Sequence, residues 1–402
     1  MIFDTHVHLG LKAFFSPPPS VNTVELPILN NARESRWNEY VRQAEKQSIA
    51  KALVFPFPLP YIQTAKANDY VLKAASCRPD LFLPMLLISN DISQLCQHKS
   101  QIAGAKEEFY LQGAREPHQF TEAYDFLQQH NLILMIHPHW EDRISRIKKI
   151  IKNFPKLRII LAHSGRKWPF TGEDVIEMIL PVFRKYENLI FDTSTIRDSK
   201  VIRALVEKAG AHRVIFGSDY PFYKTEGECV YSHELDTIKK SGIKEDDMHR
   251  VLCQNFKDIL LPETYLRRAL RDDLVRMAEI VAEISIVERK HLAIDKKIET
   301  FRSNIKVGRH VYLLEGRDGI IAFMRESGRP NNAAMIEELY VLPQYRNRGH
   351  GTNLLRIAQG MFPELEAKTF ANNINMNSSL VRSGFKLVHK GSKILQWIWN
   401  NA

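Results

Sequence analysis

The chain has 402 residues, 44% of them hydrophobic and 25% charged, and its formal net charge at pH 7 is +10. This length exceeds one ordinary hydrophobic core and indicates two domains. No apolar run reaches the roughly 18 residues of a transmembrane helix, and no charged leader precedes the first strand-like segment, so we exclude a membrane protein and expect a cytoplasmic one.

Two histidines separated by one residue lie in the first predicted strand, residues 2–8. His6 and His8 are both preceded by apolar or small residues in the run Ile2-Phe3-Asp4-Thr5-His6-Val7-His8. Successive side chains of a strand point to opposite faces, so these two imidazoles point to the same face. Paired in this way, they are typical of a transition-metal site.

Seven more strands are predicted from apolar runs between helical stretches, and three of them end in a residue of the same kind. These three run to His137, His163 and Asp219. The predicted segments are 52–55, 82–88, 102–107, 132–137, 158–163, 189–192 and 214–219. Apolar runs that finish in His or Asp are typical of parallel strands buried on both faces, whose carboxyl ends form the mouth of a (β/α)8 TIM barrel.

The motifs of these strands resemble those of the amidohydrolase superfamily, in its amidohydrolase-related branch of hydrolases and decarboxylases. They are Asp4-Thr5-His6-Val7-His8, His137, Ala162-His163-Ser164-Gly165 and Phe216-Gly217-Ser218-Asp219-Tyr220-Pro221-Phe222. The resemblance implies one divalent metal held by His6, His8, His137 and Asp219, with His163 beside it. Zinc suits three imidazoles and a carboxylate, and manganese, iron or cobalt fit the same ligand types.

In this reading Asp219 accepts the proton of the attacking water, and His163 orients the nucleophile or polarises the scissile carbonyl. Lys106 is expected to point inward, and in some relatives a carbamylated lysine or a glutamate at this strand bridges two metals. We favour one metal, because four ligands already complete the site. Asp192 and Arg166 are candidates for substrate contact. Amide or ester hydrolysis is the first choice of reaction, and non-oxidative decarboxylation is the alternative.

The boundary between two domains is predicted at Leu261-Pro262-Glu263, because 255–260 resembles the last barrel helix and a proline then interrupts it. The barrel would occupy residues 1–262 and the second domain residues 263–402.

A strand, a turn and a helix are predicted in the second domain, over residues 337–355. Gly349 and Gly351 let the backbone approach an anion closely, and the helix that begins there offers free N–H groups and the positive end of its dipole. The segment therefore predicts a site for a pyrophosphate group.

The order of Val341-x-Pro343, Arg346-x-x-Gly349-x-Gly351 and helix resembles the acetyl-CoA loop of the GCN5-related N-acetyltransferases (GNAT). The resemblance extends back to Tyr265–Leu274 and forward through Asn372, Asn377 and Gly384-Phe385. It implies a smaller α+β domain of the GNAT fold with acetyl-CoA as its cofactor. The implied cofactor contacts are Leu339, Tyr340, Val341, Arg346, Asn347, Arg348, Gly349, His350, Gly351, Thr352 and Asn377.

One position departs from the family pattern: Leu380 stands where many members carry a tyrosine that acts as general acid on the departing thiolate. Glu337 or Glu338 would then act as base for the ammonium group, and since alternation directs them to opposite faces, at most one does so. Backbone N–H groups of Tyr340 and Val341 would polarise the thioester carbonyl. The alternative is a non-catalytic module that senses acetyl-CoA.

We therefore expect a bifunctional enzyme with small-molecule substrates. Its four cysteines, Cys77, Cys96, Cys229 and Cys253, show no CxxC spacing, which disfavours disulfides and a cysteine-bound metal. Basic residues form scattered pairs rather than one stripe interleaved with aromatic residues, so we do not expect nucleic acid as a partner. The sequence leaves a homo-oligomer open.

Overall fold

The protein, studied as a computed structural model, forms two compact units. Unit 1 contains residues 1–75 and 82–261, and unit 2 contains residues 76–81 and 262–402. The structure describes residues 1–15, 34–59, 62–107, 120–137, 143–167, 172–222, 230–287, 294–306 and 310–400. Cys229 lies outside these ranges, and the other three cysteines are free thiols. Within the described ranges, we find no helix with the length and apolarity required to cross a bilayer.

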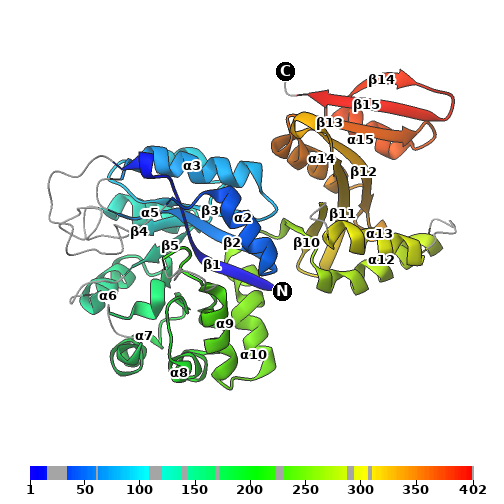
Figure 1. Cartoon of the computed structure of the whole chain (residues 1–402). Coiled ribbons are helices and arrows are strands. Elements are labelled where there is room, and N and C mark those ends of the chain that lie inside the picture. The colour runs from blue at the N-terminus through cyan, green and yellow to red at the C-terminus, as the bar shows by residue number, and fades with distance from the viewer. Residues whose placement is uncertain are drawn as a thin grey trace. The chain divides into compact units, whose positions relative to one another are not determined.

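Unit 1 is a parallel barrel whose strands follow one another in sequence order (Figure 1). Its strands are β1 (Ile2–Leu9), β2 (Ile49–Pro56), β3 (Phe82–Leu87), β4 (Gly104–Glu107), β5 (Ile133–Ile136), β6 (Arg158–Leu161), β7 (Leu189–Asp192) and β8 (Val214–Ile215). The segment after β8 returns to β1, because Thr5 N–H donates to Phe216 O at 2.9 Å and His8 N–H donates to Tyr220 O at 2.8 Å. The predicted TIM-like barrel is thus confirmed.

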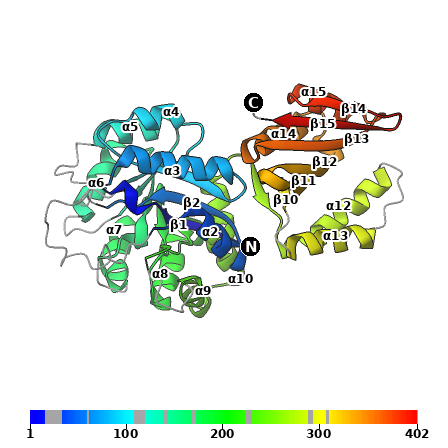
Figure 2. The ribbon, with the colours of Figure 1, turned by 45° about the horizontal axis from the view of Figure 1, so that its top comes forward.

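Helices alternate with the strands and surround them (Figures 1 and 2). They are α2 (Trp37–Lys46), α3 (Thr64–Cys77), α4 (Ser93–His98), α5 (Thr121–Gln129), α6 (Arg143–Asn153), α7 (Leu180–Phe183), α8 (Ser199–Ala209), α9 (Val230–Lys240), α10 (Glu245–His249) and α11 (Asn255–Leu260), with single turns η1 (Lys12–Phe14), η4 (Ala162–Gly165), η5 (Val175–Ile179), η6 (Ala211–Arg213) and η7 (Arg250–Gln254). Helical spacing explains how they pack: α6 buries Ile147, Ile150 and Ile151 along one face.

Several barrel strands are shorter than predicted, and two of them end well before their candidate ligands. We expected them to run to His163 and Asp219, but β6 ends at Leu161 and β8 at Ile215. His163 has φ 53° and Asp219 has φ 57°, in the left-handed region that an extended strand does not adopt. The candidate ligands after these strands therefore lie on loops just beyond them, at the mouth of the barrel.

Unit 2 contains a seven-stranded sheet in the order β14-β15-β13-β12-β11-β10-β9. The strands are β9 (Thr264–Arg268), β10 (Val311–Gly316), β11 (Gly319–Gly328), β12 (Ala334–Val341), β13 (Glu364–Phe370), β14 (Lys386–Lys390) and β15 (Ile394–Asn400), and the helices are α12 (Leu274–Val287), α13 (Ile294–Lys306), α14 (His350–Met361) and α15 (Ile374–Arg382), with turns η8 (Arg271–Asp273), η9 (Pro330–Asn332) and η10 (Pro343–Tyr345).

Each face of this sheet has its own hydrophobic core. Helices α14 and α15 cover one face, where Leu354 and Leu380 belong to the same core as Ile336. Helices α12 and α13 cover the other, where Met277 and Phe301 belong to the second core. All strand pairs are antiparallel except β12 with β13. This mixed architecture confirms the predicted smaller α+β domain.

Candidate functional sites

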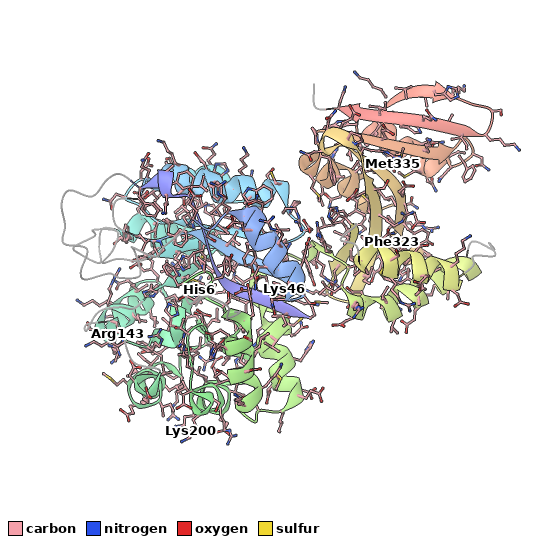
Figure 3. All side chains as sticks on the ribbon, in the orientation of Figure 1. His6, Lys46, Arg143, Lys200, Phe323 and Met335 are labelled. Atoms are coloured by element: carbon pink, nitrogen blue, oxygen red, sulfur yellow. The ribbon has the colours of Figure 1, made fainter. Side chains whose placement is uncertain are left out.

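Strand β1 brings two imidazoles to one carboxylate inside the barrel, where Figure 3 marks His6. His6 Nε2 and His8 Nε2 each lie 3.3 Å from Asp219 Oδ1. All three side chains are buried, and their three donor atoms lie within 4.8 Å of one another. The predicted alternation is therefore confirmed for His6 and His8.

Asp192, the last residue of β7, orients His6. Its Oδ2 lies 2.6 Å from His6 Nδ1, and its carboxylate also accepts bonds from the backbone N–H groups of His163 and Ser194. A carboxylate partner on Nδ1 holds the proton there and leaves the Nε2 lone pair for a cation. The sequence suggested Asp192 only as a substrate contact. The sequence feature that could have indicated this role is an acidic residue at the end of an otherwise apolar strand.

Asp4, the first residue of the histidine motif, holds the loop that carries Asp219. It is fully buried and accepts hydrogen bonds from Tyr231 Oη and Ser218 Oγ, both at 2.6 Å. It also accepts hydrogen bonds from the backbone N–H groups of Ser218, at 3.0 Å, and His6, at 3.1 Å. Asp4 thereby joins the β1 ligands to the Asp219 loop, a role that sequence reasoning missed.

His163 lies beside this centre. Its ring stacks on the His6 ring at a centroid distance of 4.9 Å, and its Nδ1 lies 2.8 Å from Ser194 Oγ. It also forms a second potential metal cluster with His6 and Asp192. His137 is only partly buried and contacts the His163 ring edge-on at 4.6 Å between centroids. Within the described ranges, neither three-residue cluster includes His137.

Two buried cationic side chains adjoin the centre. Lys106 on β4 points inward, as predicted, with Nζ 2.9 Å from His6 Nε2 and 4.1 Å from the Phe55 ring centroid. Arg166 Nε donates a hydrogen bond to Thr195 Oγ1 at 3.1 Å. A metal would therefore compete with the Lys106 ammonium for His6 Nε2.

Burial controls the charge of the cluster. It lowers the pKa of His6 and His8 well below the usual range, with the charge of Lys106 as the second cause. Burial also raises the pKa of Asp219 to about 8, although Lys106 opposes this effect. Neutral imidazoles are the form that binds metals, and a cation would stabilise the Asp219 carboxylate. These donors fit a divalent cation, and Lys106 is the group that opposes it.

Glu234 on α9 is a further buried acid near the centre. Burial raises its pKa well above the usual range, with the charges of Asp219 and Asp192 adding to this, whereas Arg197 and the backbone N–H of Thr195 favour its carboxylate. It lies on an ordinary amphipathic helix, so no local sequence pattern indicated it.

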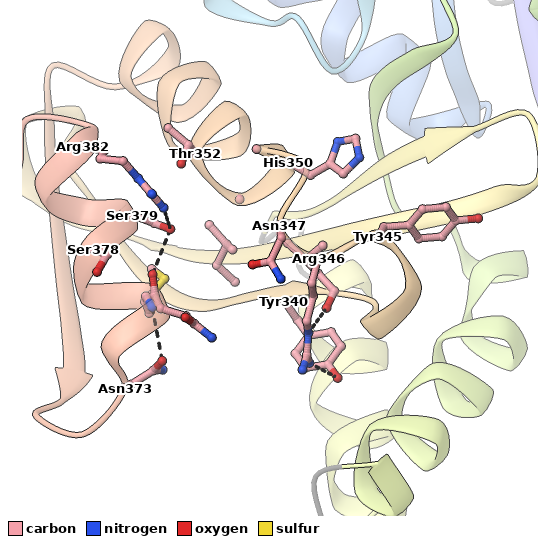
Figure 4. Close-up of a pocket in the computed structure, with 16 residues that line it drawn as sticks. Tyr340, Tyr345, Arg346, Asn347, His350, Thr352, Asn373, Ser378, Ser379 and Arg382 are labelled. Carbon is pink, nitrogen blue, oxygen red and sulfur yellow. Dashed lines mark hydrogen bonds between the residues drawn. The ribbon is translucent and has the colours of Figure 1, made fainter.

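The second site is a cavity of about 370 Å³ in unit 2, shown in Figure 4. Strands β12 and β13 pair only over 334–336 with 365–367 and then diverge. The cavity opens where they part, between the end of β12, the start of α14 and α15. Its wall includes Leu339, Tyr340, Val341, Tyr345, Arg346, Asn347, Gly349, His350, Gly351, Thr352, Asn373, Asn375, Met376, Ser378, Ser379 and Arg382.

The glycine turn has the geometry of an anion site. Gly349 precedes α14 with φ 83°, a left-handed conformation that glycine adopts at little cost. The first N–H groups of an α-helix have no intrahelical partner and, with the helix dipole, favour a negative charge. Gly351 leaves room as well, since an added Cβ would meet only Leu339 and Val341, at 3.5 and 3.6 Å.

A bulge in β12 changes the predicted roles of its backbone. Arg325 pairs with Glu338 but Glu326 pairs with Ile336, so Glu337 is the extra residue and simple alternation does not assign its face. Leu342 N–H donates to Ile321 O of β11. Because N–H groups alternate along a strand, the Val341 N–H faces away from β11 and the Tyr340 N–H faces toward it. Only one of the two predicted N–H groups thus faces the opening.

Several predicted cofactor and catalytic residues lie outside the cavity wall. The Thr369 hydroxyl donates a hydrogen bond to Asn377 Oδ1 at 2.6 Å, and the Arg348 guanidinium lies over the Tyr345 ring. Glu337 is exposed and accepts a bond from Ser327, whereas Glu338 is partly buried and pairs with Arg325 at 3.4 Å. Neither glutamate lines the cavity, and Leu380 is fully buried in the core.

Two family models match the chain. Residues 104–257 match the amidohydrolase family, and residues 274–385 match the acetyltransferase (GNAT) family. The chain joins an amidohydrolase domain to a GNAT domain. Both matching families are named for enzymes, so the chain is an enzyme. The matched part of the amidohydrolase domain includes His137, His163, Asp192 and Asp219, and it begins after β1.

One curated protein that resembles part of the chain is a decarboxylase. A 2-amino-3-carboxymuconate-6-semialdehyde decarboxylase of Dictyostelium discoideum is 28% identical over 102 residues, which cover 23% of this chain and 28% of that protein. The similar part therefore spans about a quarter of the relative's length.

Solved structures share the barrel fold. A probable 2-pyrone-4,6-dicarboxylic acid hydrolase from Acinetobacter baumannii, with citric acid bound, aligns with TM-score 0.52 at 15% identity over 64% of this chain and 98% of that one. A 2,6-dihydroxybenzoate decarboxylase complexed with 2,6-dihydroxybenzoate aligns with TM-score 0.50 at 16% identity over the same shares. At these identities the likeness is one of fold.

Proposed function

We propose that the amidohydrolase domain is a metal-dependent hydrolase of amide or ester bonds and that the GNAT domain transfers acetyl groups from acetyl-CoA to an amine. The observation that carries the first half is the convergence of His6 Nε2, His8 Nε2 and Asp219 Oδ1. The observation that carries the second half is a cavity bounded by a left-handed glycine and a helix N-terminus. Both substrates are small molecules in this proposal.

In the amidohydrolase domain, His6, His8, His137 and Asp219 would hold the metal, with zinc as first choice. When bound, a divalent metal lowers the pKa of water and polarises a carbonyl oxygen. Asp219, whose carboxylate a bound cation would stabilise, would take a proton from the attacking water. His163, whose Nδ1 lies 2.8 Å from Ser194 Oγ, would orient the nucleophile or polarise the scissile carbonyl.

Decarboxylation is the second candidate for the same domain, and two observations favour it. Lys106 and Arg166 bring two buried positive charges to the centre, where they would hold a substrate carboxylate. The Dictyostelium discoideum relative is named as a decarboxylase. We retain hydrolysis as first choice because a carboxylate-binding pair also suits a hydrolase of anionic substrates.

In the GNAT domain, the Val341 N–H would donate to the thioester carbonyl and stabilise its developing negative charge. Glu338, which alternation puts on the same side of β12 as Tyr340, would accept the amine proton directly or through water. The buried Leu380 supplies no general acid, so the thiolate would leave unaided. A non-catalytic acetyl-CoA sensor is the second candidate for this domain.

Metal analysis tests the proposed centre. We expect His6→Ala and His137→Ala to lose bound metal and all barrel activity, whereas acetyl-CoA affinity stays unchanged because its cavity belongs to the other unit. His98→Ala, which changes a partly exposed histidine at the end of α4, is the matched control and should keep its metal. Elemental analysis of the purified proteins measures this. Full occupancy in both site variants would refute the coordination.

Product analysis separates the candidate reactions. In oxygen-18 water, hydrolysis places the label in a carboxylate product, whereas decarboxylation releases stoichiometric carbon dioxide without such a label. Release of coenzyme A in the presence of a panel of amines reports on the GNAT domain. Acetyl-CoA binding without release for any amine would support the sensor instead.

A further inference from the structure

A second cavity, of about 550 Å³, adjoins the first one along α14. It is lined by Asn347, Gly349, Thr352, Asn353, Arg356 and Arg382. Asn347, Gly349, Thr352 and Arg382 line both cavities, so the two spaces lie next to each other at the glycine turn. A ligand whose phosphates lie at the start of α14 can therefore extend into the second cavity.

The spacing of these residues directs them to one side of α14. Gly349, Thr352, Asn353 and Arg356 follow one another at i, i+3, i+4 and i+7, which is one face of a helix. Arg356 comes six residues after His350, the first residue of α14, and so lies about 9 Å further along the helix axis. Its charge is thus separate from the anion site formed by the first N–H groups.

Two guanidinium groups supply the positive charge of this second cavity. Arg356 and Arg382 are both exposed, and neither forms an ion pair with an acid among the described residues. Arg382 has only a long contact, 3.4 Å, with the Ser379 hydroxyl (Figure 4). Arg346, by contrast, is engaged by Val341 O at 3.0 Å and Tyr340 Oη at 2.7 Å. The charge available beyond the glycine turn therefore comes from Arg356 and Arg382.

We propose that Arg356 and Arg382 form a subsite for the 3′-phosphate of coenzyme A, through which the GNAT domain selects the phosphorylated coenzyme over 3′-dephospho-coenzyme A. This inference rests on the proposed acetyl-CoA function. The coenzyme carries a diphosphate and, one ribose away, a phosphate monoester. The N-terminus of α14 takes the diphosphate, and the arginine pair takes the monoester. Guanidinium groups suit this role because they bind phosphate through paired, charge-assisted hydrogen bonds.

Calorimetric titration of the full chain with coenzyme A and with 3′-dephospho-coenzyme A tests the subsite. We expect the wild type to bind coenzyme A at least about tenfold more tightly, the effect of one lost charge-assisted contact. Arg356→Ala with Arg382→Ala should abolish this ratio, because it should cost at least about tenfold more affinity for coenzyme A than for the dephospho form. Arg329→Ala, at another exposed arginine of the same unit, is the control and should keep the wild-type ratio.

The possible results distinguish a failure of the 3′-phosphate subsite from a failure of the proposed acetyl-CoA function. Equal wild-type affinities for the two coenzymes, or an unchanged ratio in the double variant, would overturn the subsite and leave acetyl-CoA binding intact. A wild type that binds neither coenzyme would overturn the GNAT function itself. Circular dichroism of each variant establishes that it is folded, so a loss of binding cannot be attributed to unfolding.

Discussion

At the scale of single residues, the barrel centre depends on side chains that touch its ligands rather than on the ligands alone. Asp192 fixes the His6 ring through Nδ1, and Asp4 fixes the loop that carries Asp219. Both are buried carboxyls, and burial raises the pKa of each, that of Asp4 to about 6. Such groups persist because several donors converge on each of them.

We predict that Asp192→Asn weakens metal affinity by about 10- to 100-fold, the usual effect of altering the partner of a ligating histidine. The amide keeps the size of the carboxylate but loses its charge, so His6 is held less firmly in the tautomer that exposes Nε2. Metal competition with a chelator measures the affinity. Asp125→Asn, at an exposed position of α5, should have no effect. Wild-type affinity in Asp192→Asn would show that this contact does not tune the site.

At the scale of elements, the second site, in unit 2, lies where strand β12 diverges from strand β13. Strands β12 and β13 separate after 336, and the bulge at Glu337 shifts the register of β12 on β11. Beyond the bulge, Leu339 and Val341 pack toward the α14 and α15 core, and Tyr340 packs toward the other. The end of β12 and the start of α14 therefore both contribute to the cavity wall.

We predict that Gly349→Val weakens acetyl-CoA binding by at least about tenfold, through loss of a backbone bond to a charged group. A β-branched residue is strained at φ 83° and would separate the ligand from the first N–H groups of α14. An added Cβ at this position meets no described atom within 4 Å, so the rest of the domain should stay folded. Calorimetric titration with acetyl-CoA provides the measurement.

Gly360→Val is the matched control, since Gly360 lies exposed on the same helix with no described neighbour within 4 Å of an added Cβ. It should bind acetyl-CoA like the wild type. Equal affinities of Gly349→Val and the wild type would remove the glycine turn from the binding site.

At the scale of the whole molecule, each unit has its own core and its own candidate site. The barrel encloses the His and Asp cluster, and the mixed sheet with its two hydrophobic cores carries the glycine turn. A ligand that binds one folded unit stabilises that unit, by about 2.7 kcal/mol when its concentration is a hundred times Kd.

We therefore predict two thermal transitions in scanning calorimetry, each raised by a different ligand. Zinc should raise the midpoint of the barrel transition by several degrees, and acetyl-CoA should raise only the other. Zinc should have no such effect on His6→Ala. A single transition that both ligands raise equally would contradict independent sites.

Local patterns in the sequence determined much of both domains. Alternation in β1 established that His6 and His8 share a face, apolar runs indicated the barrel strands, and the order of strand, glycine turn and helix indicated α14. These features depend on residues close in the chain, whose backbone periodicity is the same in any fold. The amphipathic spacing of the helices is equally local.

Only the tertiary structure decided which distant atoms meet. The contact of Asp192 with His6 spans 186 residues, and that of Lys106 with His6 spans 100. His163 and Asp219 adopt left-handed backbones beyond the ends of β6 and β8, and β12 and β13 diverge beside the glycine turn. Arg356 and Arg382 line one space from two helices. Closure of the barrel and register of the sheet determine such distances, and no local pattern of the sequence encodes either.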